Sequence, residues 1–173
     1  MTLAVVAGVL LGWAGAIQLT GNIDTVEAGA VYRSAQLSPE RLKRLIDEKQ
    51  LKTVFNLRGA HRGEDWYDAE KKLLNEAGVA LVDVPMSAIH QPNPKVLADL
   101  VAALKTARKP FLIHCNSGSD RTGLAAALYD LIVRSMSPGE ARRQLSFYWG
   151  HFPWLGSGTI AMDETFDAVA ARR

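Results

Sequence analysis

Residues 111–115 (FLIHC), a short and almost entirely apolar run, constrain the fold of this chain more than any other part of its sequence. The run is preceded by Lys109-Pro110 and followed by a polar loop and an alanine-rich, helix-like segment. A run this short and this apolar is typical of a strand buried on both faces, as in a parallel sheet. We therefore expect residues 111–115 to form a central strand that leads through a loop into a helix.

Strand-like and helix-like segments alternate along the chain. Apolar periodicity, N-caps at Ser38 and Asn93, and a Ser137–Glu140 capping box mark the predicted elements. Helices are predicted for residues 38–50, 66–78, 94–107, 124–134, 139–149 and 158–172, and further strands for residues 52–59 and 79–86. The alternation predicts an α/β domain with a central, mostly parallel sheet flanked by helices.

The first twenty residues depart from this pattern. Residues 3–19 carry no charge, and their length is at the short end of what crosses the apolar core of a bilayer or forms the apolar part of a signal peptide. We therefore divide the chain into an N-terminal apolar segment, 1–20, and a globular domain, 21–173. We expect the segment to be a membrane anchor or a signal, with a buried terminal helix as the alternative. The location expected for the domain is membrane-associated, with the periplasm favoured over the cytoplasm.

Charge and cysteine content exclude several classes of function. The chain has 20 Lys and Arg residues, 18 Asp and Glu residues and a net charge of +2, without a basic cluster, so no nucleic-acid partner is expected. Its one cysteine, Cys115, forms no internal disulfide, and no cysteine or histidine spacing typical of zinc is present. Cys115 is therefore either a core residue or a reactive group.

The polar loop after the central strand favours the reactive alternative. The segment between Cys115 and Arg121 consists of Asn116, Ser117, Gly118, Ser119 and Asp120, and Thr122 and Gly123 follow. Such a loop before a helix N-terminus can direct successive N–H groups inward and bind a tetrahedral oxyanion. Gly118 supplies the freedom that the turn needs, and Gly123 is expected to let the helix begin close to the sheet. The same N–H groups favour the thiolate form of Cys115.

These residue types suggest phosphoryl transfer without a metal or other cofactor. The guanidinium of Arg121 can hold two phosphate oxygens while the Cys115 thiolate attacks phosphorus. Thr122 is expected to stabilise the departing thiolate through its hydroxyl, and His114 to orient the loop through its carbonyl groups.

The segment HCNSGSDRTG, residues 114–123, resembles the His-Cys-x5-Arg-Ser/Thr signature loop of the protein tyrosine and dual-specificity phosphatases. Residues 31–59 are similar to the first part of the compact bacterial and fungal dual-specificity-like members. The resemblance implies the phosphatase α/β fold, metal-free phosphomonoester hydrolysis, Cys115 as nucleophile and Arg121 as phosphate holder. The implied substrates are phosphotyrosine proteins, extended to phosphoserine and phosphothreonine, with phosphoinositides or inositol phosphates as the alternative.

The general acid is less clearly marked. Family members usually carry an aspartate on a separate loop, but the corresponding residues 87–93 contain no carboxylate, and Asp83 lies within a predicted strand. Asp120 is the predicted acid, since myotubularin lipid phosphatases and certain secreted bacterial phosphatases carry aspartate at this position. The alternatives are that Asp120 only holds the loop, or that Asp83 or His90 is the acid.

Residues outside the signature loop are candidates for binding or for structural roles. Arg58 ends a predicted strand on the same edge as the signature loop, where it would contact a substrate phosphate or form a salt bridge between loops. Arg33 and Gln36 are expected to form structural hydrogen bonds. The aromatic residues of 147–154 are expected in the core, or else Trp149 and Trp154 line a pocket or lie at a lipid interface.

Two other classes of protein fit the cysteine loop less well. A pseudoenzyme would bind a phosphorylated partner without turnover, although Cys115, Arg121 and Thr122 are all present. A sulfurtransferase would also use a cysteine loop, but the five-residue spacing with Arg-Thr-Gly suits phosphate better. The sequence makes no prediction of the oligomeric state.

Overall fold

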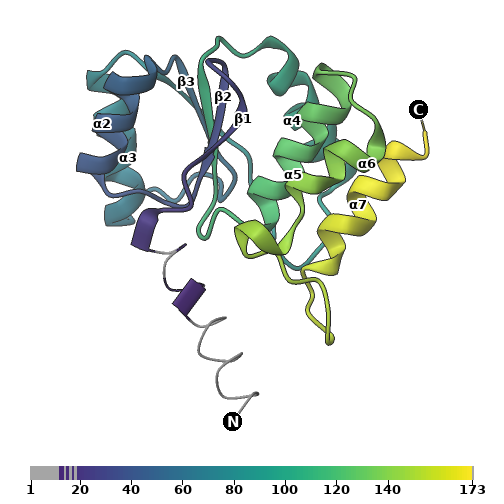
Figure 1. Ribbon diagram of the computed structural model, residues 1–173. Helices are drawn as coiled ribbons and strands as arrows, with labels where there is room; N and C mark the ends of the chain where they lie inside the picture. Colours follow the sequence, from purple (N-terminus) through teal and green to yellow (C-terminus); the bar gives the residue numbers. More distant parts are fainter. Residues whose placement is uncertain (1–11, 14, 16, 18, 173) are drawn as a thin grey trace.

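The computed structural model describes residues 12, 13, 15, 17 and 19–172 (Figure 1). Its centre is a sheet with the strand order β1-β2-β5-β3-β4. The strands are β1 (Asp24–Glu27), β2 (Val31–Ser34), β3 (Thr53–Asn56), β4 (Ala80–Asp83) and β5 (Phe111–His114). Strand β1 pairs antiparallel with β2, and all the other pairings are parallel. The predicted mostly parallel sheet with a central strand at residues 111–115 is thus confirmed.

Helices cover both faces of the sheet, and Figure 1 shows α2 and α3 on one side and α4, α5, α6 and α7 on the other. Their bounds are α2 (Pro39–Lys49), α3 (Asp65–Glu76), α4 (Pro94–Thr106), α5 (Asp120–Leu128), α6 (Pro138–Ala141) and α7 (Ile160–Ala170). Successive strand residues face opposite layers. Leu112 therefore packs in the core below α2 and α3, whereas Phe111 and Ile113 pack below α4, α5 and α7.

The ends and the buried face of helix α2 follow from its local sequence. The Ser38 side chain accepts a hydrogen bond from the first turn, and Gln50 ends the helix in the left-handed conformation. Leu42, Leu45 and Ile46 form the buried face predicted from their spacing. Burying each of these side chains contributes about 1.5–3 kcal/mol of hydrophobic stabilisation.

Two predicted helices differ in the structure. Helix α5 begins at Asp120, not at residue 124, and continues as a π-helix, η1 (Tyr129–Val133). The predicted helix 139–149 is wrong: α6 is followed by two single 3-10 turns, η2 (Arg142–Gln144) and η3 (Phe147–Trp149). The chain turns there because the backbone and side-chain oxygens of Gln144 face the buried Arg33.

The core interpretation of the aromatic segment 147–154 is wrong for most of its members. The exposed fractions are 37% for Phe147, 66% for Tyr148, 40% for Phe152 and 54% for Trp154. Trp149 is half-buried and lies over a guanidinium, as described below. The segment therefore forms a largely exposed aromatic loop.

The apolar segment predicted at residues 3–19 lies for the most part outside the described residues. Within the described part of the chain, no helix combines the length and apolarity needed to cross a membrane. The ring of Trp13 stacks on that of Phe147, with centroids 4.6 Å apart. Membrane attachment and the division at residue 20 stay predictions.

The parallel strands end in one row. Register places Ser34 of β2, His114 of β5, Asn56 of β3 and Asp83 of β4 side by side at the C-terminal edge of the sheet. Ligands of such sheets bind beyond this edge. The signature loop begins there, directly after His114.

Candidate active site

The signature loop is held from behind through its carbonyl groups. Cys115 follows β5 and is buried, with 1% of its surface exposed. Three successive carbonyl oxygens after it accept hydrogen bonds from outside the loop. The pairs are Asn116 O with Gln36 N at 3.0 Å, Ser117 O with Asn22 Nδ2 at 3.0 Å, and Gly118 O with Arg33 Nη2 at 2.8 Å. Because these carbonyls are directed outward, the loop can direct its N–H groups inward.

The N–H groups of residues 116–122 donate to no other group in the described part of the chain. Helix α5 starts at Asp120, so its positive end adds to the field of these groups. Gly118 has φ of +75°, and a Cβ there would lie 2.7 Å from the backbone of Ser34 and Ala35. The turn therefore requires glycine at 118, as predicted, and the loop has the geometry of an anion-binding nest.

Gly123 lies against the segment that follows α6. A Cβ at this position would lie 2.9 Å from the carbonyl oxygen of Gln144 and 3.0 Å from the side chain of Leu145. The glycine thus lets the segment after α6 pack against the start of α5.

Arg33 is the buried cation beneath the loop. Its Nη1 donates to the backbone and side-chain oxygens of Gln144, and its guanidinium lies 4.2 Å from the ring centroid of Trp149. Burial lowers the pKa of Arg33 to about 10, against the opposing effect of negative charge at Cys115 and nearby aspartates. These hydrogen bonds are the structural role predicted for Arg33.

Arg121 closes the loop and keeps part of its donor capacity. Its Nη1 donates to the carbonyl oxygen of Met86 at 3.1 Å, which holds the side chain against the loop between β4 and α4. Among the described residues, its buried Nε has no hydrogen-bond partner, and neither has the buried hydroxyl of Thr122. Both groups are thus available for the roles predicted for them.

His114 does not bond to carbonyl groups of the loop, contrary to expectation. Its Nε2 lies 3.0 Å from Oε1 of Glu70, which is 3% exposed, and its Nδ1 has no partner in the described part of the chain. Burial raises the pKa of Glu70, but the hydrogen bonds from His114 and Gln36 outweigh this effect and hold the pKa below its usual value. The pair fixes the end of β5 against α3.

Arg58 is joined to the same network. Its Nη1 donates to Oε1 of Gln36 at 3.2 Å, and its guanidinium lies 3.5 Å from the ring centroid of Trp66. Burial and the positive charge of Arg121 both lower the pKa of Arg58. Within the described residues Arg58 forms no ion pair within 4.0 Å. The salt-bridge interpretation is therefore wrong, and Arg58 is a second cation near the signature loop.

The alternative acids are placed differently from Asp120. Asp83 accepts hydrogen bonds from Asn56 Nδ2 at 2.9 Å and from the Tyr67 hydroxyl at 2.6 Å, so both of its oxygens are engaged. Burial and this carboxylate raise the pKa of Tyr67 to about 12. His90 lies on the surface. The Asp120 side chain is 16% exposed and contacts the imidazole of His151 through one oxygen.

Sequence reasoning missed Glu70 and His151. Glu70 shares the buried face of α3 with Tyr67 and Leu74, so the helical spacing contained a signal for it. A carboxylate on a buried helix face needs a partner, and His114 at the end of a buried strand was a candidate. No comparable signal marked His151, which lies in the exposed aromatic loop.

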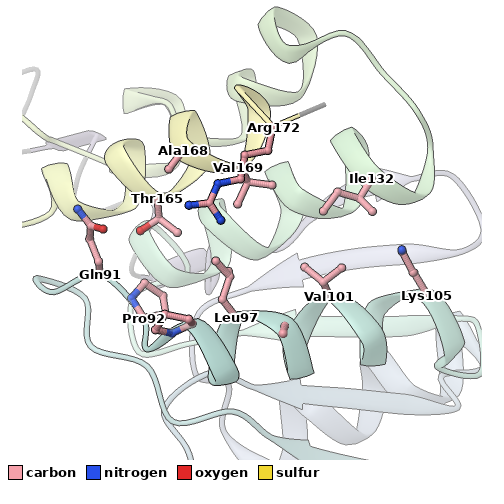
Figure 2. A pocket seen from close by; sticks show the side chains of 12 residues that line it. Gln91, Pro92, Leu97, Val101, Lys105, Ile132, Thr165, Ala168, Val169 and Arg172 are labelled. Atoms are coloured by element: carbon pink, nitrogen blue, oxygen red, sulfur yellow. The ribbon is translucent and has the colours of Figure 1, made fainter.

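A cavity of about 500 Å³ lies apart from the signature loop (Figure 2). It is a groove between α4 and α7, lined mainly by apolar side chains such as Leu97, Val101, Ile132 and Val169. None of residues 114–123 lines it. The groove is therefore not part of the candidate active site.

A cysteine at the floor of an anion-binding loop, an arginine that closes the loop and a helix that starts behind it define the class of cysteine-based phosphatases. Comparison with known families gives the same result. The chain belongs to the family described as DSP-PTPase phosphatase fused to NAD+ kinase, which matches residues 15–157.

Individual relatives share less than a third of their aligned residues with this chain. The chain is 28% identical over 134 residues to the dual specificity protein phosphatase TpbA of Pseudomonas aeruginosa (strain UCBPP-PA14), covering 77% of this chain and 57% of TpbA. It is 30% identical over 100 residues to the inositol diphosphatase SIW14 of Saccharomyces cerevisiae, covering 55% of this chain and 34% of SIW14. The chain thus spans little more than half of TpbA and about a third of SIW14.

Solved structures confirm the fold. Tk-PTP in its active form superimposes with a TM-score of 0.66 at 15% identity, covering 87% of this chain and 97% of Tk-PTP. The core catalytic domain of SIW14, crystallised with citrate, gives a TM-score of 0.62 at 22% identity, with 87% and 91% coverage. TpbA gives 0.61 at 21% identity, with 84% and 86% coverage.

Proposed function

We propose that this chain hydrolyses phosphomonoesters through a phosphocysteine intermediate on Cys115. The observation that carries the proposal is the signature loop, whose outward carbonyl groups are held by Gln36, Asn22 and Arg33 while its N–H groups have no protein acceptor among the described residues. A loop fixed in this way before substrate binds stabilises an oxyanion without reorganising during the reaction.

The proposed reaction has two steps. The Cys115 thiolate attacks phosphorus, the Sγ–P bond forms as the P–O bond breaks, and the leaving oxygen takes a proton from an acid. Water then attacks phosphorus, loses a proton to the same group, and releases phosphate and the thiolate. Arg121 holds two equatorial oxygens with its guanidinium, and the Thr122 hydroxyl stabilises the sulfur when it departs.

Asp120 is the proposed acid. It begins α5 beside Arg121 and is partly exposed, whereas both oxygens of Asp83 accept hydrogen bonds at the end of the sheet. Replacing Asp120 by Asn should lower kcat for a phosphate ester with a poor leaving group by about 100-fold, the range of general acid catalysis. If Asp83→Asn has that effect and Asp120→Asn has none, Asp83 is the acid.

Phosphotyrosine proteins are the substrates that we propose first. Similarity to TpbA, named as a dual specificity protein phosphatase, supports a phosphoprotein substrate that includes phosphoserine and phosphothreonine. A specific observation supports inositol phosphates as the second candidate. Arg58 is a second cation near Arg121, and SIW14, an inositol diphosphatase, is among the relatives.

Release of inorganic phosphate tests the proposal. The wild-type chain should hydrolyse an aryl phosphate in the presence of a chelator, vanadate should inhibit it, and Cys115→Ser should abolish it. A panel of phosphotyrosine and phosphoserine peptides and inositol phosphates then ranks the substrates by kcat/KM. Binding of a phosphopeptide without release of phosphate would indicate a pseudophosphatase, and sulfur transfer to cyanide would indicate a sulfurtransferase.

A further inference from the structure

A buried histidine joins the signature loop to the last helix. His151 is 1% exposed, and its Nδ1 lies 2.8 Å from Oδ1 of Asp120 while its Nε2 lies 2.7 Å from Oδ2 of Asp163. An imidazole nitrogen bonds to an ionised carboxylate only by donating a proton. Both contacts can therefore form together in two protonation states. Either the ring carries two protons, or the ring carries one proton and the second proton is shared between the other ring nitrogen and its carboxylate.

The surroundings of His151 balance this charge. Oδ1 of Asp163 accepts a hydrogen bond from Nη2 of Arg142 at 3.0 Å, and Arg142 also pairs with the exposed Asp167. The charged groups facing the cluster are therefore Asp120 from α5, Asp163 and Asp167 from α7, and Arg142 from η2. Burial lowers the pKa of His151, but the hydrogen bonds to Asp120 and Asp163 outweigh it and the net shift is upward.

Resting on the proposed function, we propose that His151 is a positioning residue for the general acid. It fixes the Asp120 carboxylate at the start of α5 and stores the proton that Asp120 delivers to the leaving oxygen. A carboxylate that contacts a protonated imidazole does not need to hold its proton before the reaction begins.

The proton balance closes over both steps. As the P–O bond breaks, the leaving oxygen takes a proton from Asp120, and the Nδ1 proton of His151 passes to Oδ1 of Asp120. The ring is then neutral and still donates from Nε2 to Asp163. When water attacks the phosphocysteine, its proton returns through Asp120 to Nδ1.

The alternative is that the cluster only ties α5 to α7. The two roles are separable because the Asp163 carboxylate contacts His151 and Arg142, and its negative charge therefore acts on the acid through the imidazole. Asp163→Asn removes a negative charge and keeps the shape of the side chain. Asp167→Asn is the matched control, since it changes an exposed partner of Arg142 on the same helix.

A second variant separates geometry from proton storage. In His151→Asn the amide nitrogen occupies the position of Nδ1, so a donor to Asp120 remains but it does not titrate. Catalysis should then depend on the acid itself, and the loss should be larger when the leaving group is poor.

The experiment measures kcat against pH for phenyl phosphate, a poor leaving group, and for 4-nitrophenyl phosphate, a good one. His151→Asn should lower kcat for phenyl phosphate by about 10- to 100-fold, within the range of general acid catalysis, and for the nitrophenyl ester by less than about 3-fold. The basic limb for phenyl phosphate should move to lower pH in Asp163→Asn and stay in place in Asp167→Asn.

The outcomes are distinct. Equal losses for both esters in His151→Asn, or a basic limb that Asp163→Asn leaves in place, overturn the assignment of His151 while the proposed function stands. Absence of Cys115-dependent hydrolysis in the wild-type chain overturns the proposed function and this assignment together. NMR of the imidazole nitrogens in the wild-type chain tests the proton store without any variant: His151 should keep both ring protons above pH 6.5, and a neutral ring at pH 6 overturns the assignment.

Discussion

The buried guanidinium of Arg33 donates a 2.8 Å hydrogen bond to the carbonyl oxygen of Gly118, and this contact links the floor of the sheet to the middle of the signature loop. Arg33 is 0% exposed. The same guanidinium binds Gln144, which ends the turn after α6. One side chain therefore fixes both the anion-binding loop and the segment that packs against it.

Replacing Arg33 by Met should destabilise the domain by about 3–5 kcal/mol, because the carbonyl oxygens of Gly118 and Gln144 lose a charged donor and stay buried. Urea denaturation measures the change. Arg143→Met is the matched control: Arg143 is exposed, and the expected change is below about 0.5 kcal/mol. Similar midpoints for the two variants would show that Arg33 does not support the loop.

Gly118→Ala should abolish most of the activity while the domain stays folded. The residue has φ of +75°, and the added Cβ would lie 2.7 Å from backbone atoms of Ser34 and Ala35, so the loop must shift. A shift of about 1 Å in a catalytic group lowers kcat about 100-fold. Gly139→Ala is the control, because no atom beyond its chain neighbours and the backbone of its own helix lies within 4 Å of its Cβ position. Phosphate release by both variants, with circular dichroism to verify folding, gives the comparison.

The sheet and the signature loop were predictable because their signals are local. Phe111, Leu112 and Ile113 are apolar and consecutive, and Cys115 to Arg121 is one unbroken chemical motif. The turn after α6 was not predictable in this way. Its cause is the contact of Arg33 with Gln144, which are 111 residues apart, and it overrides local helix propensity.

The contact of His151 with the proposed acid could not be predicted either, because it also joins residues far apart in the sequence. His151 lies 31 residues from Asp120 within an aromatic stretch, and contacts such as that of Ser119 Oγ with the carbonyl oxygen of Trp149 at 2.7 Å hold this stretch beside the start of α5. The sequence favoured burial of Phe147 and Trp154, because aromatic residues at this density are usually buried, but both side chains are exposed.

Stability should fall as the pH rises through the folded-state pKa of His151. Since that pKa is raised above its unfolded value of about 6.5, the stabilisation is fully present below pH 6.5 and is lost at higher pH. Thermal melts from pH 6 to pH 9 should therefore show a falling Tm for the wild-type chain. In His151→Asn this contribution is absent, so the two Tm curves should converge at high pH. A constant gap between the curves across this range would contradict the prediction.

Arg58 should separate the two candidate substrates. Its guanidinium lies near Arg121, but among the described residues it donates only to Gln36 and stacks on Trp66, so it has donors left for a second phosphate group. An inositol ring carries neighbouring phosphates, whereas a phosphotyrosine peptide presents one. Arg58→Gln should raise KM for a multiply phosphorylated inositol by about 10- to 100-fold, the value of a charge-assisted hydrogen bond, and for a phosphotyrosine peptide by less than about 3-fold.

The matched control for this comparison is Arg62→Gln, which removes an exposed charge from the same loop. If Arg62→Gln raises KM for the inositol phosphate as much as Arg58→Gln does, the effect is general electrostatic attraction and not a contact made by Arg58. Measuring KM at two salt concentrations separates these causes, because attraction by exposed charges weakens as salt increases, whereas a partly buried contact is screened much less. A loss in Arg58→Gln that persists at high salt, with Arg62→Gln unaffected there, would place a second phosphate at Arg58.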